Sequence, residues 1–371
     1  MEYGWRAPTS ISGIIHSNSS DDSGTLNRTF ATINVLGWST RLNLILIIPK
    51  TFAVIEYRQF VNSDPPHILR LWHECQLGRG AAQGLHCDEF DELVFAQTYF
   101  DPAGMILACR DGQVIGFVHA GFGSKDDRTW LCYDEGVICA VMVHPTVRGQ
   151  GIGRELVKRA EQYLRGRGSK KLFAGPAEPR DPFYCGIYGG SQSAGFLQSD
   201  PAAAPFLAKL GYLPCESHLV FQRSLGVGSA DPVGSRLVNV RRTTRLTALS
   251  TDPKSWWWQT RYGRLDAMHL ALIPRTGGSP LARISVVGMD RYVNSWQTRG
   301  IGLLGLYVTE ANRKKGYGQA LLVEVCRRVR DDMVQLAEAH APKSDAAAIA
   351  VLESAGFQQI DLGHVYCRQD P

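Results

Sequence analysis

The stretch that decides the fold is VHPTVRGQGIG at residues 143–153, which has a counterpart in VTEANRKKGYG at residues 308–318. Each begins with a valine five residues before an arginine and then runs through Arg-x-x-Gly-x-Gly. A continuous apolar run leads into each stretch, GVICAVMV at 136–143 and GLLGLYV at 302–308, and apolar residues at helical spacing follow. The repeat therefore predicts, twice over, a buried strand, a tight loop and a helix.

The residues of this loop favour an anion as the ligand. Glycines let a backbone approach a ligand closely and adopt positive φ angles. The helix that follows presents unpaired N–H groups and the positive end of its dipole, and arginine adds a planar cation. One such loop could be no more than a tight turn, but two copies in the same strand–loop–helix context favour a cradle for a pyrophosphate.

Two other glycine-rich loops do not fit. The loop has no Gly-Lys-Ser/Thr, which excludes the P-loop of nucleotide triphosphatases. Its spacing, Gly149-x-Gly151-x-Gly153, differs from the G-x-G-x-x-G of dinucleotide-binding folds, and the next strand-like run, residues 171–174, lacks the acidic residue that such a site needs at its end.

The pattern resembles motif A of the GCN5-related N-acetyltransferase (GNAT) family, in which this loop holds the pyrophosphate of acetyl-CoA. The family's downstream motif, Asn-x-x-Ala-x-x-x-Tyr-x-x-x-Gly-Phe, is similar to Asp-x-x-Ala-x-x-x-Leu-x-x-x-Gly-Tyr at 200–212 and Asp-x-x-Ala-x-x-x-Leu-x-x-x-Gly-Phe at 345–357. The resemblance covers about residues 54–225 and 238–370. It implies an α/β fold, a mixed sheet flanked by helices, in two tandem acyltransferase domains.

Composition along the chain suggests where those domains lie. Residues 1–53 are rich in Ser, Thr, Asn and Gly and are interpreted as a poorly ordered extension, with a strand at 43–48 as the alternative. The first domain is expected at 54–225, a Gly/Ser-rich linker at 226–237 and the second domain at 238–371.

The first domain carries an insertion. The arginines of the two loops are 165 residues apart (313 − 148), whereas the aspartates of the downstream motifs are 145 apart (345 − 200). The 20 extra residues fall around PFYCGIYGGSQSAGFL at 182–197, which forms either a wall of the substrate site or a surface excursion. The first domain is preferred as the catalytic one because of its fuller loop and this insertion.

Bulk properties narrow the classes of function. The net charge of +5 is dispersed along the chain, so a nucleic-acid partner is not expected. The nine cysteines are odd in number and show no C-x-x-C spacing, which argues against a disulfide framework and a zinc site and favours a reducing cytoplasm. No apolar run is long enough to cross a membrane.

The resemblance implies which residues hold acetyl-CoA. In the family the central strand splays near its end, and its backbone amides face the thioester. The matching positions in both copies, with those of the two loops, are Val141, Met142, Val143, Arg148, Gly149, Gln150, Gly151, Ile152, Gly153, Leu306, Tyr307, Val308, Arg313, Lys314, Lys315, Gly316, Tyr317 and Gly318.

The catalytic groups are harder to assign. Many family members protonate the leaving thiolate with the tyrosine of the downstream motif, where this chain has Leu207 and Leu352. Tyr184 and Tyr188 in the insertion are candidates in its place, with ordinary packing as the alternative. Glu135 stands just before the buried strand, where family members often have a glutamate. It is the candidate general base, with a solvated carboxylate as the alternative.

Asp134, His144, Glu310 and His340 are weaker candidates for the base. The three tryptophans at 256–258 either cover a cleft or pack in the domain interface.

The function expected from these residues is transfer of an acetyl group from acetyl-CoA to a primary amine, by direct attack on the thioester and without a metal. The acceptor would be a small molecule or a peptide, with neither nucleic acid nor membrane as a partner. The alternative is a non-catalytic acyl-CoA-binding or scaffolding protein with degenerate active sites, which the two leucines favour.

Overall fold

The computed structural model describes residues 31–35, 38–42, 54–250 and 254–369, in two compact units, 1–53 and 54–371. Within the described part of the first unit, β1 (Ala31–Val35) and β2 (Trp38–Leu42) form an antiparallel pair. The alternative strand expected at 43–48 lies outside the described residues, and the extension over 1–53 stays a prediction.

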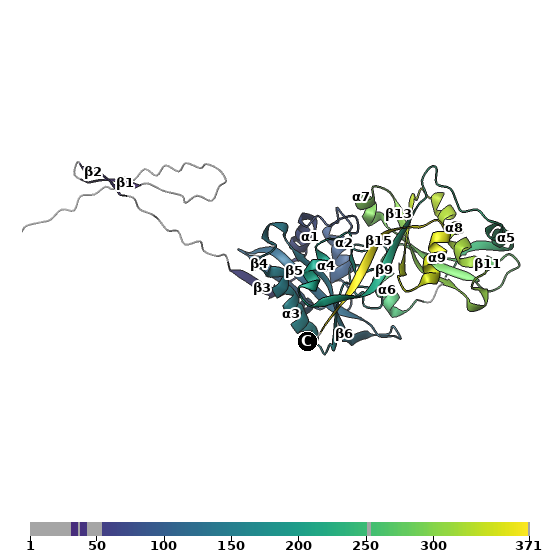
Figure 1. Ribbon diagram of the computed structural model, residues 1–371, viewed down its shortest axis with the longest axis horizontal. Helices are drawn as coiled ribbons and strands as arrows, with labels where there is room; N and C mark the ends of the chain where they lie inside the picture. The colour runs from purple at the N-terminus through teal and green to yellow at the C-terminus, as the bar shows by residue number, and fades with distance from the viewer. Residues whose placement is uncertain (1–30, 36–37, 43–53, 251–253, 370–371) are drawn as a thin grey trace, which may run out of the picture. The chain divides into compact units, whose positions relative to one another are not determined.

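The second unit contains two runs of elements in matching order (Figure 1). The first run consists of β3 (Ile55–Gln59), α1 (Pro65–Glu74), α2 (Cys87–Phe90), β4 (Met105–Arg110), β5 (Gln113–Ser124), β6 (Leu131–Val143), α3 (Ile152–Gly166), β7 (Lys171–Ala174), β8 (Phe196–Leu197), α4 (Ala203–Ala208) and β9 (Tyr212–Ser224). The second run consists of α5 (Ser235–Thr243), β10 (Thr244–Ala248), α6 (Trp256–Tyr262), β11 (Ala267–Pro274), β12 (Ala282–Gly288), α7 (Val293–Trp296), β13 (Gly300–Val308), α8 (Tyr317–Arg330), β14 (Leu336–Pro342), α9 (Ala346–Ser354) and β15 (Gln358–Arg368).

The strand–loop–helix prediction is confirmed in both halves. The helices predicted after the loops form as α3 and α8, and their apolar stripes are buried. In α3 the buried positions include Leu156, Ala160 and Leu164, which recur every four residues and so face the sheet together. β4 and β5 form a hairpin through an Asp-Gly turn, with Asp111 and Gly112 both at positive φ.

The strands of this unit join in one mixed sheet of 13 strands, in the order β10-β11-β12-β13-β14-β9-β15-β7-β6-β5-β4-β3, with β8 beside β15. Two parallel pairs matter for the site: β6 with β7, and β13 with β14. The first pairing ends at Ile138 and Ala174, and the second at Leu303 and Ala339. Beyond these residues β6 and β13 continue without their parallel neighbour, so the strands splay.

A β-bulge marks the start of each splayed segment. On β6, His119 of β5 pairs with Ala140 and the next residue, Ala120, pairs with Ile138, which leaves Cys139 as the extra residue. On β13, the register shifts by one residue beside Gly305, whose φ is +62°. A bulge turns the backbone locally, so N–H groups that would face a neighbouring strand can face a ligand instead.

The last strand of each half lies beside the other half. β9 ends the first run yet pairs with β14, while β15 ends the second run yet pairs with β7. The two exchanged strands also pair with each other, side by side in the middle of the unit (Figure 1). Backbone hydrogen bonds therefore connect the two halves without a break.

Side-chain packing is also shared between the halves. The cluster around α1 and the insertion takes in Tyr262, Val287, Met289 and Leu304 from the second run. The predicted linker at 226–237 stays a prediction, and its last residues already belong to α5. Of the tryptophans at 256–258, Trp257 is fully buried and packs against Tyr99 of the first half, as the interface alternative expects.

Candidate functional site

The first loop has the backbone shape that an anion cradle requires. Gly149 and Gly151 have φ angles of +79° and +84°. A Cβ atom added at either position would meet nothing within 4 Å, so no packing contact explains these two glycines. Gly151 caps α3, and the first helical hydrogen bond runs from the N–H of Glu155 to its carbonyl, at 3.1 Å. The N–H groups of residues 152–154 precede that bond and point out of the helix end.

The second loop has the same backbone shape but different surroundings. Gly316 caps α8 with a φ of +87°, and Lys314 has a φ of +61° where the first loop has Gly149. A Cβ atom on Gly316 would lie 2.7 Å from Cδ and 2.9 Å from Cγ of Arg236. The side chain of Arg236, from α5, therefore covers the second loop, whereas the first loop is open.

The arginine of each loop turns back towards its strand. Arg148 donates from Nε to the carbonyl of Val143 at 3.0 Å, and Arg313 donates to the carbonyl of Val308 at 3.4 Å. Both guanidinium groups thus lie at the end of the splayed segment. The side chain of Gln150 accepts a hydrogen bond from Arg110 at 2.8 Å.

The helix of each downstream motif packs on the last glycine of the loop. A Cβ on Gly153 would lie 3.1 Å from the ring of Phe206 in α4, and a Cβ on Gly318 would lie 3.3 Å from Val351 in α9. Any larger residue would push α4 or α9 away from the loop. The leucines that replace the usual tyrosine are buried in these helices, Leu207 at 1% and Leu352 at 4% exposure.

A narrow crevice lies at the start of the first downstream motif. Its volume is about 10 Å³, room for roughly one water molecule. The lining comes from the α1–α2 loop, the insertion and the start of the downstream motif: Leu77, Gly78, Gly80, Ala81, Tyr188, Leu197, Ser199 and Asp200.

Of the predicted catalytic residues, Tyr188 lines this crevice. Its hydroxyl accepts a hydrogen bond from the N–H of Leu197 at 3.2 Å. Burial raises the pKa of Tyr188 well above its usual value, with the nearby carboxylate of Asp200 adding to the effect. The hydroxyl therefore stays protonated at neutral pH.

Tyr184 lies in the core and not in the crevice. It is 1% exposed, and its hydroxyl contacts Nδ1 of the fully buried His119 at 3.0 Å. Its ring stacks on Trp72 at 6.2 Å and meets Phe90 edge-on. The two predicted tyrosines therefore do not share one site, since Tyr184 is enclosed in the core and Tyr188 lines the crevice.

Glu135 lies in an ion-pair network at the start of the β6–β7 pairing. Its carboxylate contacts Lys171 at 3.4 Å and Arg180 at 3.1 Å, and Arg180 also pairs with Glu216. Glu135 lies within β6 (Leu131–Val143) and not just before the strand, eight residues from Val143, where the loop begins.

The weaker base candidates are also engaged. Asp134 pairs with Lys170 at 3.0 Å, and His144 contacts Thr146 at 2.7 Å through Nδ1 and Glu74 at 3.6 Å through Nε2. In the second half, Glu310 lies 3.9 Å from Arg313, and His340 contacts the buried carboxylate of Glu338 at 3.2 Å.

Two residues near the site carry no sequence signal. Cys75, at the end of α1, places its Sγ 3.7 Å from the carbonyl of Val143, and burial raises the pKa of its thiol. Tyr366, on the exchanged strand β15, pairs with Ala174, the last residue of β7 that contacts β6. Only the fold brings Tyr366 from the far end of the chain to the first splay.

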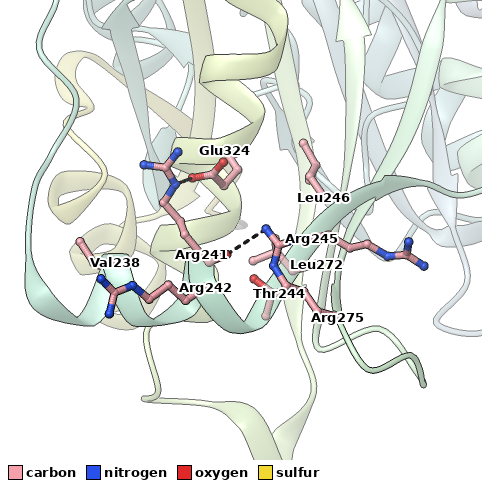
Figure 2. A pocket seen from close by; sticks show the side chains of 9 residues that line it. All are labelled: Val238, Arg241, Arg242, Thr244, Arg245, Leu246, Leu272, Arg275 and Glu324. Atoms are coloured by element: carbon pink, nitrogen blue, oxygen red, sulfur yellow. Dashed lines mark hydrogen bonds and ion pairs between the residues drawn. The ribbon is translucent and has the colours of Figure 1, made fainter.

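A larger cavity of about 500 Å³ lies elsewhere, between α5, β10, β11 and α8. Its cations are Arg241, Arg242, Arg245 and Arg275. Figure 2 shows the guanidinium groups of Arg242 and Arg245 pointing away from each other, while Arg241 pairs with Glu324 at 2.8 Å. The charges do not converge on one point, and this cavity lies apart from both loops.

Two negative findings hold for the part of the chain that the structure describes. It contains no group of three or more His, Cys, Asp or Glu side chains arranged to hold a metal ion. No helix in it is long and apolar enough to cross a membrane. All nine cysteines are free thiols.

Comparison with known proteins gives the same family for both halves. The model of the acetyltransferase (GNAT) family matches residues 68–186 and again 243–357, together well over half of the chain. An acetyltransferase of Yersinia enterocolitica is 30% identical over 118 residues, covering 32% of this chain and 73% of that protein. Mycothiol acetyltransferase of Cellulomonas flavigena is 35% identical over 104 residues, or 27% of this chain, and the match spans only 28% of that relative.

Solved structures show the same architecture over a longer stretch. A tandem GNAT protein from the clavulanic acid biosynthesis pathway superimposes with a TM-score of 0.60 at 17% identity, covering 86% of this chain and 99% of that one. A GCN5-related N-acetyltransferase of Sphaerobacter thermophilus gives a TM-score of 0.56 at 17% identity, covering 85% and 95%. These likenesses establish a fold of two tandem GNAT domains, and with the two family matches the chain belongs to the acetyltransferase (GNAT) family.

Proposed function

We propose that the chain is an acetyl-CoA-dependent N-acetyltransferase whose first half holds the donor and acetylates a primary amine. The observation that carries the proposal is the contrast between the loops. Gly149 and Gly151 have positive φ angles and open space beside them, whereas Arg236 covers Gly316 in the second loop. The pyrophosphate of the donor would bind the N–H groups at the start of α3, with Arg148 as its counter-ion.

The splayed end of β6 fits the rest of the donor. Beyond Ile138 the strand has lost its parallel neighbour, and β5 pairs with its other edge as far as Val143. N–H groups on the open edge would hydrogen-bond the thioester oxygen as negative charge develops there. The neutral amine attacks the carbonyl carbon, the C–S bond breaks, and the thiolate of CoA leaves.

Proton transfer is proposed to involve two residues. Tyr188 would supply the proton to the thiolate, because of the two predicted tyrosines it is the one that lines the crevice. Glu135 would take the proton of the acceptor ammonium before attack, and only through intervening water, because Lys171 and Arg180 occupy its carboxylate. Tyr184 is the less suitable acid, because its hydroxyl is enclosed with His119.

A second function is favoured by a different observation. Leu207 and Leu352 occupy both positions where the family resemblance expects a tyrosine, and a leucine cannot donate a proton. A chain that binds acyl-CoA without turning it over would have this property.

We also propose a primary amine as the acceptor and a cytoplasmic location for the chain. The nine free thiols support the proposed location.

The test compares matched substitutions in the two loops. CoA binding would be measured by calorimetry for the wild-type chain, Arg148→Ala and Arg313→Ala. Thiol release from acetyl-CoA would be measured over a panel of a polyamine, an aminoglycoside, an amino acid and a peptide N-terminus. We expect Arg148→Ala to weaken CoA binding at least tenfold and Arg313→Ala to have little effect. Binding without turnover of any amine would support the non-catalytic alternative, and unchanged affinity in Arg148→Ala would refute the loop assignment.

A further inference from the structure

The two walls of the crevice are tied together by a residue from the other half of the chain. Tyr292 lies in a 3₁₀ turn (Asp290–Tyr292) just before α7. Its hydroxyl accepts a hydrogen bond from the N–H of Gly190, in the insertion, at 3.0 Å. The same hydroxyl donates to the carbonyl of Gly80, in the α1–α2 loop, at 3.2 Å. A tyrosine hydroxyl can do both at once, so a single oxygen atom bonds to both walls.

The hydroxyl is held firmly in this position. Tyr292 is fully buried, and its ring stacks on Trp296 of α7 at 4.6 Å. Burial raises the pKa of Tyr292 well above its usual value, so the hydroxyl keeps its proton and continues to donate. Because the ring is fixed by packing, movement of either wall would have to break a hydrogen bond to it.

The residues that follow Tyr292 hold the same wall. Ser295 donates from its hydroxyl to the carbonyl of Ala81 at 2.6 Å. Asn294 donates from its amide to the carbonyl of Gln83 at 3.1 Å. The second half therefore contacts three carbonyls of the α1–α2 loop, and two of those residues, Gly80 and Ala81, line the crevice.

The walls also meet each other directly. The N–H of Gly189 donates to Gly80 at 2.8 Å, and the N–H of Ala82 donates to Ile187 at 2.8 Å. These bonds join the α1–α2 loop to the insertion, and Tyr292 bonds to both of these segments. Because the crevice is so narrow, it has to widen to admit an amine, and the bonds of Tyr292 add to these direct bonds in resisting movement of the walls.

Each wall is continuous with an element that touches the donor loop. The α1–α2 loop begins just after Cys75, whose Sγ lies 3.7 Å from the carbonyl of Val143. The insertion leads into α4, whose Phe206 packs on Gly153. A displaced wall would therefore misplace an acceptor relative to the thioester, and transfer is sensitive to such misplacement.

We propose that Tyr292 is a positioning residue for the acceptor amine, so that the second half completes the acceptor site of the first. The inference rests on the proposed function, in which the first half holds acetyl-CoA, and it adds that the amine enters this crevice. It gives the second half a role in transfer even though its own loop is covered.

The test removes one oxygen atom. Tyr292→Phe keeps the ring and its stacking on Trp296. Tyr99→Phe is the matched control, because Tyr99 also donates to a backbone carbonyl of the insertion, that of Pro182 at 2.8 Å, but does not line the crevice. With the amine that the wild-type chain acetylates fastest, we expect Tyr292→Phe to raise the acceptor KM about fivefold or more. The affinity for CoA should stay within about twofold, and Tyr99→Phe should change neither quantity. Ser295→Ala should raise the acceptor KM in the same direction.

Amide hydrogen exchange supplies a readout that needs no acceptor. In Tyr292→Phe the amides of residues 78–82 and 187–191 should exchange faster than in the wild-type chain, while those of α3 should not. Unchanged exchange in these segments would overturn the inference, and so would faster exchange with an unchanged acceptor KM. Failure of the proposed function would look different, since the wild-type chain itself would then release no thiol with any amine.

Discussion

Glu338 of β14 accepts a hydrogen bond from the backbone N–H of Ser191 at 2.7 Å, across 147 residues of sequence. The carboxylate is 2% exposed and also accepts from the side chain of Gln222 on β9 at 2.9 Å. Gln222 in turn bonds to Arg79 of the α1–α2 loop. One buried carboxylate of the second half therefore supports the insertion directly and the loop through Gln222.

Replacing this carboxylate should destabilise the whole unit. Glu338→Gln replaces one of the two carboxylate oxygens with an N–H₂ group. The donor that bonds to that oxygen, either the N–H of Ser191 or the side-chain amide of Gln222, is then buried without a partner. We expect a loss of about 1–3 kcal/mol in the free energy of unfolding, measured by urea denaturation. Glu353→Gln, at an exposed position of α9, should change it by less than about 0.5 kcal/mol. Equal effects of the two substitutions would contradict the role given to Glu338.

The cover over the second loop leads to a prediction about stoichiometry. The aliphatic stem of Arg236 lies against Gly316, the residue that caps α8 at the second loop. We expect calorimetry to give one CoA per wild-type chain and a second, weaker site in Arg236→Ala. Arg241→Ala, further along α5 and paired with Glu324, should keep a single site. Two equal sites in the wild-type chain would show that Arg236 does not block the loop.

The backbone of the second loop predicts a stabilising substitution. Lys314 has a φ of +61°, a conformation that costs a non-glycine residue about 1–2 kcal/mol. Lys314→Gly removes this strain but also loosens the unfolded chain, so we expect a net gain of about 0.5–1 kcal/mol in the free energy of unfolding. The adjacent Lys315 does not have positive φ. Lys315→Gly should therefore destabilise the chain, and thermal melts of the two variants should shift in opposite directions.

The buried His119 predicts sensitivity to acid. It is fully buried, and burial lowers its pKa from 6.5 to about 3. Between these values the unfolded chain binds a proton that the folded chain does not, so stability falls as the pH drops below about 6.5. The loss from this residue should reach about 2 kcal/mol at pH 5.

Urea denaturation at pH 7.5 and pH 5 would check this value. His119→Asn can keep a hydrogen bond to the hydroxyl of Tyr184 but does not titrate, so the stability difference between the two pH values should shrink by the same amount. An unchanged difference would mean that His119 is protonated in the folded chain.

Much of the local structure could be predicted from the sequence. The loop glycines adopt the positive φ angles expected of them, and α3 and α8 begin immediately after them. The apolar runs before each loop form buried strands, and the Gly-aromatic turn after α4 places a buried aromatic residue, Tyr212. These features depend on the conformations allowed to one residue or on a period of a few residues, so nearby sequence is enough.

The candidate catalytic residues were less predictable. Tyr184 and Tyr188 are four residues apart in a glycine-rich insertion, and sequence does not distinguish them. Tyr184 is enclosed beside His119, whereas Tyr188 lines the crevice. The difference comes from segments more than 60 residues away in the chain: His119 and Trp72 contact Tyr184, whereas the α1–α2 loop lines the crevice together with Tyr188.

The sequence by itself determined the family, the two loops and the order of elements in each half, because these depend on backbone conformation and short-range apolar patterns. Only the tertiary structure decided that β9 and β15 exchange places, that Arg236 covers the second loop, and that Tyr292 and Glu338 hold the walls of the crevice. Strand partners and buried hydrogen bonds between distant residues depend on how the two halves of the sheet and the insertion pack together. No local pattern encodes that packing. A buried donor or acceptor could form its hydrogen bond with any complementary group that the fold placed beside it, so its own sequence neighbourhood does not identify its partner.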